Sequence, residues 1–400
     1  MERSELLELM SPAGLRLLDS LPPYTSSTDA LASVSALRKA GHPPALVAAV
    51  LSQAKLRGKA QAKFGEFSSH MLFTAAGLEQ ATRLRVAALH AGRFQTAGAG
   101  HIADLGCGIG GDALAMAALG LTVTAVEADE ITAAIAAYNL APFETASVVN
   151  ARAEDAAGTA AALADVDGIY LDPARRTAGH SNTKRLTDPN DYSPSLDFAF
   201  GLGERMPTGV KLGPGLDRRL IPHDAEAQWI SVDGQLVELG VWFGAVARDG
   251  IRRSALVLSA GEPAELTGPA DSEDEPVGEL GEYLYEPDGA VIRARLIGDL
   301  ARRMHARMIS DGIAYLTTDI PVSTPFATGF RVRERLPFQE RELKRALRER
   351  GIGTLEIKKR GANVDPAALR TRLSLRGNAS ATLVLTRIGG KHEALLVDRV

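Results

Sequence analysis

The residues with the clearest chemical potential form a glycine-rich stretch, GCGIGG, which follows a short apolar run within residues 101–112. Gly106, Gly108 and Gly110 fit the spacing G-x-G-x-G, whereas Gly111 in place of Gly110 gives G-x-G-x-x-G. Glycines in a turn between a strand and a helix let backbone N–H groups approach a bound nucleotide closely. The spacing by itself does not say which nucleotide cofactor such a loop holds.

Two acidic residues narrow the choice of cofactor. Asp104 lies two residues before the first glycine, at the end of the predicted strand. A carboxylate there suits the cationic amino group of a methionine moiety and repels a pyrophosphate. Glu127 ends the next predicted strand, in VTAVEAD, where an acid can accept hydrogen bonds from both ribose hydroxyls of either kind of cofactor. Asp104 therefore favours S-adenosylmethionine over a dinucleotide, whereas Glu127 is compatible with both.

The apolar patterns around these residues predict how they are positioned. Residues 1–95 carry helical patterns and no strand pattern. From residue 101 onward, short apolar runs (HIADL, LTVTAVE, ASVVN and DGIYLD) alternate with alanine-rich helical stretches. Alternating strands and helices predict βαβ units and a parallel sheet, in which the strand ends that carry the acids meet at one edge.

Three stretches, DLGCGIGGD, AVEAD and YLDPARR, lie in this order at the ends of the first, second and fourth of these predicted strands. In type and order they resemble motifs I, II and IV of the class I S-adenosylmethionine-dependent methyltransferases. The resemblance covers residues 100–260 and implies a doubly wound, Rossmann-like core that binds S-adenosylmethionine. It also implies that the three glycines of the loop line the cofactor, that Asp104 faces its amino group and that Glu127 takes its ribose.

Two further stretches resemble cofactor-binding segments of the same methyltransferases. In NARAEDA, Arg152 stands where an acid near the adenine is usual, and Glu154 and Asp155 follow it. The resemblance leaves open which residue meets the adenine, and we take Asp155 as the candidate. Upstream of the glycine loop, Phe73 and Thr74 resemble the extra motif that closes over the methionine end of the cofactor.

The stretch DPAR carries the expected chemistry at the methyl acceptor. In methyltransferases that act on exocyclic or ring nitrogens, the matching stretch reads (Asn/Asp)-Pro-Pro-(aromatic), and it accepts hydrogen bonds from the target nitrogen. Catalysis is then mostly positioning. Here Ala174 replaces the second proline and Arg175 the aromatic residue, and an arginine can stack on a base or hold a phosphate. We therefore expect Tyr170, Asp172 and Arg175 nearest to the acceptor.

The single cysteine, Cys107, bears on both the chemistry and the compartment. DPAR is also similar to the DPPR of 5-methyluridine RNA methyltransferases, which activate the pyrimidine carbon with a cysteine nucleophile. Because Cys107 lies inside the predicted cofactor loop, we do not expect this covalent route. A chain with one cysteine has no disulfide framework, which is typical of a reducing compartment.

Charge is distributed unevenly along the 400 residues, whose net charge is −4. Residues 1–100 carry 11 Lys/Arg and 7 Asp/Glu, and residues 325–400 carry 17 and 8, so these flanks have net charges of +4 and +9. Residues 101–324 therefore carry −17. Basic flanks around an acidic centre favour binding to a polyanion. The alternative is that the three parts of the chain have differently charged, solvated surfaces and that none of them binds a polyanion.

The C-terminal stretch from GIGTLEIKKRGANVDPAALR to the end closely resembles that of bacterial methyltransferases with a THUMP-like domain. The helical N-terminus and the pattern KFG…FT…GLEQATR are similar to the same family, so the resemblance covers nearly the whole chain. THUMP domains present RNA, and the resemblance therefore implies an RNA-modifying role.

Two groups of basic residues are the predicted RNA contacts. One group lies at helical spacing on one face of a predicted helix, and the other is the KKR edge that the THUMP-like resemblance carries over. Each could instead be a charged surface without a ligand. The predicted RNA contacts are Lys55, Lys59, Lys63, Lys358, Lys359 and Arg360.

We predict an α/β protein with a doubly wound Rossmann-like methyltransferase core, a helical N-terminal domain and a small C-terminal α/β THUMP-like domain. The acidic residues 261–282, rich in Pro and Gly, are a candidate linker. The predicted domains are 1–98 (helical), 99–278 (methyltransferase) and 279–400 (THUMP-like).

The expected activity is methyl transfer from S-adenosylmethionine to a base nitrogen of RNA, with tRNA or rRNA as the expected partner. The alternatives are a methyltransferase for a small molecule or protein, and an RNA-binding protein whose cofactor site is regulatory or vestigial. The eight histidines show no metal-ligand spacing, so no metal is expected. The absence of a signal peptide and of an 18-residue apolar run predicts a cytoplasmic protein without a membrane partner.

Overall fold

A computed structural model describes residues 3–22, 34–158, 165–175 and 192–400, apart from the side chain of Arg175. The chain forms two compact units. Unit 1 consists of Met1–Leu212 and Trp242–Ala247. Unit 2 consists of Gly213–Val241 and Arg248–Val400. The division into three domains made from the sequence stays a prediction.

Unit 1 begins with helices, as the sequence predicts. They are α1 (Arg3–Leu9), α2 (Pro12–Asp19), α4 (Pro44–Phe64), the short 3-10 helix η1 (Gly65–Ser69), α5 (Ala75–Gln80) and α6 (Leu84–Thr96). Local sequence explains their ends. The hydroxyl of Ser11 caps α2 by accepting a hydrogen bond from Gly14 N–H, and Thr74 caps α5 through Gly77 N–H. Helix α4 ends at Gly65, whose positive φ of 55° suits glycine.

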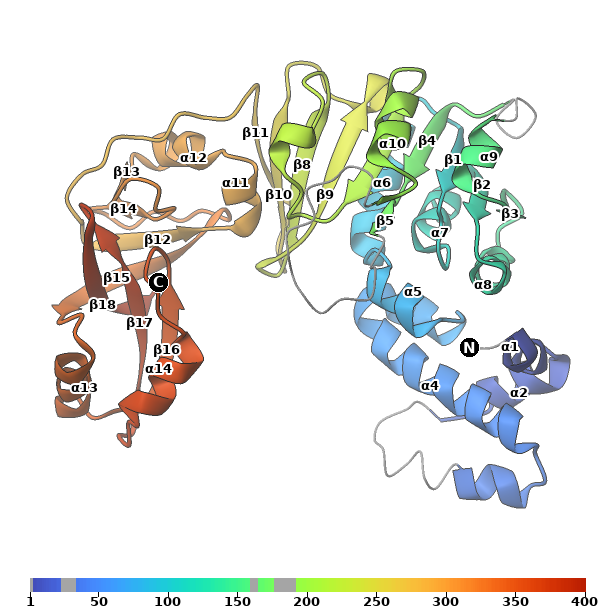
Figure 1. The fold of residues 1–400 in the computed structure, drawn as a ribbon, viewed down its shortest axis with the longest axis horizontal. Coiled ribbons are helices and arrows are strands. Elements are labelled where there is room, and N and C mark those ends of the chain that lie inside the picture. Colours follow the sequence, from blue (N-terminus) through green and yellow to red (C-terminus); the bar gives the residue numbers. More distant parts are fainter. Residues whose placement is uncertain (1–2, 23–33, 159–164, 176–191) are drawn as a thin grey trace. The chain divides into compact units, whose positions relative to one another are not determined.

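A parallel sheet forms the second part of unit 1. Its strands are β1 (His101–Leu105), β2 (Thr122–Glu127), β3 (Ala146–Asn150), β4 (Gly168–Leu171) and β7 (Thr208–Leu212). They lie in the order β7-β4-β1-β2-β3, and each neighbouring pair is parallel. Figure 1 labels the last four of these strands. Chain order reverses between β1 and β4, which is the switch point where open α/β sheets bind ligands. This confirms the predicted doubly wound core.

Short helices connect these strands, as the alanine-rich stretches predict. The remaining elements of unit 1 are α7 (Gly111–Ala118), α8 (Glu130–Leu140), α9 (Ala153–Gly158), the antiparallel pair β5 (Ala174–Arg175) and β6 (Tyr192–Ser193), α10 (Leu196–Gly203) and the 3-10 helix η4 (Gly244–Val246). Helix α6 packs against α7, which in turn packs against β2. The N-terminal helices and the sheet are therefore parts of one compact unit.

Two buried amides fix the segment between η1 and α5 against the core. The Asn139 side chain accepts a hydrogen bond from Leu72 N–H (2.8 Å) and donates to the carbonyls of Leu72 (3.0 Å) and Ile109 (2.9 Å). The Gln53 side chain accepts from Phe73 N–H (3.0 Å) and donates to its carbonyl (2.7 Å). Because Ile109 belongs to the glycine loop, Asn139 ties this segment to the loop.

Unit 2 contains two sets of strands. The first set comprises β8 (Glu226–Val232), β9 (Gln235–Phe243, whose last two residues belong to unit 1), β10 (Arg253–Leu258) and β11 (Ala264–Gly268), together with the 3-10 helix η3 (Arg218–Leu220). Strand β8 pairs in parallel with β10, and β11 pairs antiparallel with β10. Strand β11 lies inside the candidate linker, and Asp271 forms an ion pair with Arg253 at 2.7 Å. The first half of the acidic stretch is therefore part of the fold and not a free linker.

The second set forms a seven-stranded sheet in the order β13-β14-β12-β15-β18-β17-β16. These elements are β12 (Tyr283–Pro287), α11 (Gly289–Arg293), α12 (Ile297–Met304), β13 (Arg307–Met308), β14 (Leu316–Thr318), β15 (Ala327–Leu336), α13 (Glu340–Glu349), β16 (Ile352–Lys359), α14 (Pro366–Leu373), β17 (Ala379–Ile388) and β18 (Lys391–Arg399). Only β16 and β17 pair in parallel among the described residues of this sheet. This confirms the mixed α/β character predicted for the C-terminal part.

We expect Asn139→Leu to destabilise unit 1 by about 2–4 kcal/mol, because leucine leaves the buried peptide groups of Leu72 and Ile109 without a partner. The midpoint of urea unfolding and hydrogen exchange at Leu72 measure the effect. Gln95→Leu is the control, since Gln95 is exposed on α6, and it should change stability by less than about 0.5 kcal/mol. Unchanged exchange at Leu72 in the Asn139 variant would contradict the role of this amide.

Candidate functional site

The glycine loop joins β1 to α7 and has a backbone conformation that residues with a side chain rarely adopt. Gly106, Gly108 and Gly110 have φ values of 91°, 58° and 83°, in the left-handed region that favours glycine. The N–H groups of Gly106 and Cys107 donate to the carbonyl of Val126 at 2.8 and 3.0 Å, which ties the loop to the end of β2. A Cβ built on Gly108 meets no described atom within 4 Å, so a ligand can approach the backbone there.

Asp104 is a buried carboxylate at the end of β1. It is 1% exposed, and its Oδ2 has no hydrogen-bond partner among the described residues. Burial raises its pKa well above the usual value, and the negative charges of Asp112, Asp172 and Glu127 raise it further, whereas Lys211 opposes them. A buried carboxylate that has one oxygen without a partner and lies among other acids fits a cationic amino group. The structure therefore agrees with S-adenosylmethionine at this loop.

Glu127 ends β2 beside the loop. Its Oε2 accepts a hydrogen bond from Gly108 N–H at 3.0 Å, and its Oε1 accepts one from Asp129 N–H at 2.8 Å. The carboxylate thus lies at the rim of the loop, where ribose hydroxyls could reach it. Asp155, the adenine candidate, is exposed in α9, which follows β3.

Phe73 and Thr74 lie near the loop but have structural partners. Phe73 is fully buried, and its ring centroid lies 5.7 Å from that of Phe64. Thr74 caps α5, in which a Cβ on Gly77 would lie 2.5 Å from the Ile109 side chain of the glycine loop. The segment therefore packs against the loop, with the Phe73 side chain directed into the core, and a contact of Phe73 or Thr74 with the cofactor stays a prediction.

Asp172 directly follows β4 and lies beside the loop. β4 pairs with β1, and a Cβ on Gly106 would lie 3.9 Å from the carbonyl oxygen of Asp172. Its side chain is 33% exposed, and its Oδ2 lies 2.5 Å from the Nζ of Lys211. Arg175 lies in β5, but its side chain is outside the described part of the chain.

Tyr170 is a core residue. It is 1% exposed, and its hydroxyl lies 2.9 Å from Nδ1 of His90, which lies 2.9 Å from Oδ1 of Asp112. Its ring packs against His90 and Phe94, with centroids 5.3 and 6.4 Å apart. Burial within this network removes Tyr170 from the residues that we propose to contact the acceptor.

Lys211 is a site residue that the sequence analysis missed. It lies in β7, and its ammonium donates to the hydroxyl of Thr82 at 2.9 Å and pairs with Asp172. The available signal was a lysine inside GVKL, an otherwise apolar run that was predicted to be a strand. Charged side chains are rarely buried without a specific partner.

Lys63 is a structural residue, unlike its neighbours on α4. Its ammonium donates to three backbone carbonyls, those of Leu78 (2.9 Å), Glu79 (2.6 Å) and Ala81 (2.7 Å). Burial and the charge of Lys211 lower its pKa. We therefore remove Lys63 from the proposed RNA contacts, whereas Lys55 and Lys59 are exposed and stay candidates.

The KKR edge in unit 2 also contains both residues that are bound within the fold and an exposed residue. Lys358 pairs with Glu286 at 2.7 Å, and Arg360 lies 3.7 Å from the same carboxylate and over the ring of Tyr315. Both cations are paired with carboxylates within the fold, since Lys358 also lies 3.8 Å from Glu356, and we therefore remove both from the proposed contacts. Lys359 is exposed at the end of β16 and stays a candidate.

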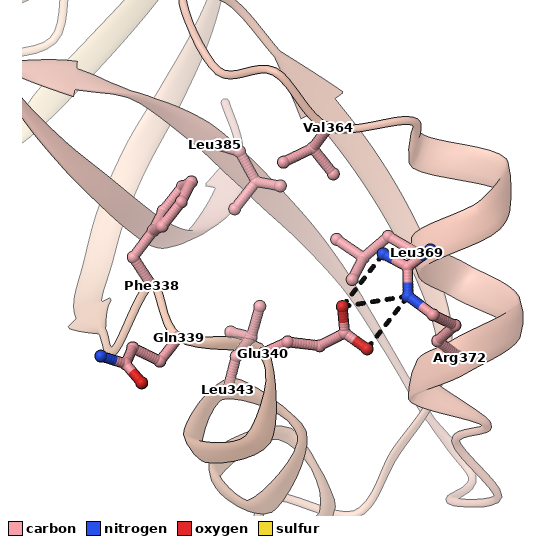
Figure 2. A pocket seen from close by; sticks show the side chains of 8 residues that line it. All are labelled: Phe338, Gln339, Glu340, Leu343, Val364, Leu369, Arg372 and Leu385. Carbon is pink, nitrogen blue, oxygen red and sulfur yellow. Dashed lines mark hydrogen bonds and ion pairs between the residues drawn. The ribbon is translucent and has the colours of Figure 1, made fainter.

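Unit 2 also contains a pocket of about 370 Å³ between α13 and α14. In Figure 2, Glu340 and Arg372 form an ion pair at its edge, with their closest atoms 3.0 Å apart, while leucine side chains and Phe338 supply the apolar lining. The sequence analysis assigned a role to none of the lining residues. They are Phe338, Gln339, Glu340, Leu343, Val364, Leu369, Arg372 and Leu385.

Among the described residues, no helix has both the length and the apolar character needed to cross a bilayer. No group of three or more His, Cys, Asp or Glu side chains in the same part of the chain could hold a metal ion.

Comparisons with known proteins match both ends of the chain to family models. Residues 327–399 match a family described as THUMP domain-like, and residues 2–60 match a domain of unknown function, DUF8688. The crystal structure of a proposed methyltransferase from Porphyromonas gingivalis W83 has the same fold. Its TM-score is 0.72 at 21% sequence identity, over 94% of this chain and 99% of that chain.

A relative covers most of the sequence. An uncharacterized S-adenosylmethionine-dependent methyltransferase, present in the CDC 1551 and H37Rv strains of Mycobacterium tuberculosis, is 34% identical over 350 residues, which are 84% of this chain and 91% of the relative. This likeness confirms the family, the activity and the cofactor that the three motifs predict. The chain belongs to a family of S-adenosylmethionine-dependent methyltransferases and carries a THUMP-like domain in its C-terminal part.

Proposed function

We propose that this methyltransferase transfers the methyl group to a nitrogen atom of an RNA base, with tRNA or rRNA as the substrate. The observation that carries the proposal is the Asp172 carboxylate. It follows β4 at the switch point of the sheet, beside the glycine loop, and is one-third exposed. A hydrogen-bond acceptor in this position can orient an N–H group toward a methyl donor held by the loop.

The cofactor would be held by the residues around the loop. The Asp104 carboxylate faces the amino group, Gly106, Gly108 and Gly110 provide the bare backbone, and Glu127 accepts from the ribose hydroxyls. Asp155 is the candidate on the adenine side. When bound, S-adenosylmethionine supplies an electrophilic methyl group on a cationic sulfur.

The chain contributes positioning rather than a covalent nucleophile. Asp172 accepts a hydrogen bond from the target N–H, which orients the nitrogen lone pair for in-line transfer, and the proton leaves to solvent after the transfer. Cys107 is unsuited to attack a base, because burial and the charge of Asp104 raise the pKa of its thiol well above the usual value. Arg175 is the proposed contact to the base or its phosphate.

Two observations support RNA as the substrate. Residues 327–399 match a THUMP-like family, and THUMP domains present RNA. Residues 325–400 also carry a net charge of +9, which suits a polyanion. The exposed residues Lys55, Lys59 and Lys359 are the proposed phosphate contacts.

Asp104→Asn should weaken S-adenosylmethionine binding by about 10- to 100-fold, because the amide loses a charge-assisted hydrogen bond to the ammonium group. Calorimetry measures the loss, and NAD should give no binding heat. The exposed Asp197 on α10 offers the same chemical change as a control, and Asp197→Asn should leave the affinity unchanged. Because the pKa of Asp104 is raised, wild-type affinity should fall as the pH is lowered through that pKa. Clear NAD binding without S-adenosylmethionine binding would refute the cofactor assignment.

Nucleoside mass spectrometry of total RNA, with and without this protein, tests the substrate. We expect one N-methylated nucleoside to disappear in cells that lack the protein and to return with the wild-type gene. Asp172→Ala should fail to restore it, while its S-adenosylmethionine affinity stays within a few-fold of wild type. Unchanged RNA nucleosides would favour a small-molecule or protein acceptor. RNA binding without any turnover would favour a regulatory or vestigial cofactor site.

Salt dependence tests the phosphate contacts. Replacing Lys55, Lys59 and Lys359 by alanine should flatten the slope of log affinity against log salt by about two units, at about 0.7 per contact on single strands. Binding of one RNA over a salt series gives the slope. The double variant Lys358→Ala/Arg360→Ala is the control, because Glu286 already pairs both side chains. Equal slopes for wild type and the triple variant would mean that these lysines are only solvated.

A further inference from the structure

Lys211 is a cation in an unfavourable place. It lies in β7, where all five residues are buried, and its own side chain is 10% exposed. An ammonium group in such a place costs free energy unless partners compensate it, and an apolar side chain of similar size is often more stable. The contacts of Lys211 should therefore show what this charge does.

One side of Lys211 is anchored in the scaffold. Its Nζ donates to the hydroxyl of Thr82 (2.9 Å) and weakly to the carbonyl of Gln80 (3.4 Å). Thr82 in turn donates to Oδ2 of Asp112 (2.6 Å), whose other oxygen lies 2.9 Å from Nδ1 of His90. Thr82, Asp112 and His90 are all buried, so this anchor is rigid.

The other side of Lys211 reaches the proposed acceptor site. Its Nζ lies 2.5 Å from Oδ2 of Asp172, and the Asp172 side chain is 33% exposed. The ion pair therefore has a buried, anchored cation and a partly open carboxylate. The open side of the pair lies at the switch point of the sheet, beside the glycine loop, where the acceptor is proposed to bind.

The surrounding charges give Lys211 a second effect. The groups that act on Asp104 are Asp112 in α7, Asp172 after β4, Glu127 in β2 and Lys211 in β7, and Lys211 is the cation among them. Lys211 also helps to hold the pKa of Asp112 below its usual value, together with hydrogen bonds from His90 and Thr82, although burial acts in the opposite direction. Lys211 thus balances charge on both the acceptor side and the cofactor side.

We propose that Lys211 is a positioning residue for methyl transfer, whose anchored ammonium holds the Asp172 carboxylate in place and ionised for the acceptor nitrogen. The proposal rests on the proposed function of Asp172 and assigns Lys211 no contact with substrate. It explains why a charged residue occupies a strand that is buried along its whole length.

Cofactor binding tests the charge coupling without any acceptor. Lys211 opposes the rise in the pKa of Asp104, whereas Asp172 contributes to it. In Lys211→Met, the pH midpoint for tight S-adenosylmethionine binding should therefore move up by about half a unit or more, and in Asp172→Asn it should move down. Calorimetry over a pH series measures both shifts. Lys39→Met, at an exposed lysine of unit 1, is the control and should not shift the midpoint. Shifts in the same direction, or none, would overturn the proposal.

A double-mutant cycle tests whether Lys211 acts through Asp172. The assay follows transfer from radiolabelled S-adenosylmethionine to total RNA from cells that lack the protein. Lys211→Met should lower kcat by about 100-fold or more with a KM for the cofactor within about three-fold, and it should cause no further loss in the Asp172→Asn background. Lys211→Arg, which keeps the charge, should recover part of the rate. Independent, multiplying losses would overturn the proposal.

A substitute variant and a wild-type control separate a failure of Lys211 from a failure to fold and from a wrong substrate. Lys211→Gln, which retains a donor without the charge, replaces Lys211→Met in both experiments if circular dichroism shows that the methionine variant is unfolded. Wild-type protein that labels no RNA would contradict the proposed substrate, whereas the pH series would still decide the role of Lys211.

Discussion

Negative charge gathered at the carboxyl ends of the parallel strands is the constraint on which the rest of unit 1 depends. Asp104 is buried, and Asp112, Asp172 and Glu127 add to the field that keeps its pKa high. Such a cluster destabilises the fold unless cations balance it. Lys211 provides one cation from within the fold. A cofactor with an ammonium and a sulfonium group provides more when it binds, so the site prefers cationic ligands.

The helices before the sheet are part of this arrangement. Asn139 and Gln53 hold the segment that carries Leu72 and Phe73 against the glycine loop. Thr82, which lies between α5 and α6, connects Lys211 to Asp112. The N-terminal region therefore supports the site from behind, which explains why it forms one compact unit with the sheet. A parallel sheet alone would leave the buried carboxylate of Asp112 without its partners Thr82 and His90.

Motif order and apolar patterns predict the doubly wound core, the loop and the position of Asp172, because strand ends and glycine turns are local features of sequence. The contact partners of a side chain are not a local feature, because they can come from distant parts of the sequence. Tyr170 lies two residues before Asp172, yet its hydroxyl joins a buried network through His90, which lies 80 residues away. Lys63 has the same helical spacing as Lys55 and Lys59, but the end of α5 takes all its donors. Helical spacing predicts which face a side chain shares and not what lies opposite that face.

The same charge distribution limits how RNA could approach the site. Residues 101–212, which include the glycine loop and its neighbouring strands, carry 7 Lys/Arg and 15 Asp/Glu, so this part of the chain has a net charge of −8 and repels phosphates. On the proposed function, the backbone of the RNA must be held elsewhere, and only a base or a local contact such as Arg175 enters the site. Basic residues with partners inside the fold, such as Lys358 with Glu286, cannot do this, because their charge is already neutralised. A high net charge of a segment therefore overstates its affinity for RNA, and the exposed, unbalanced cations are the relevant measure.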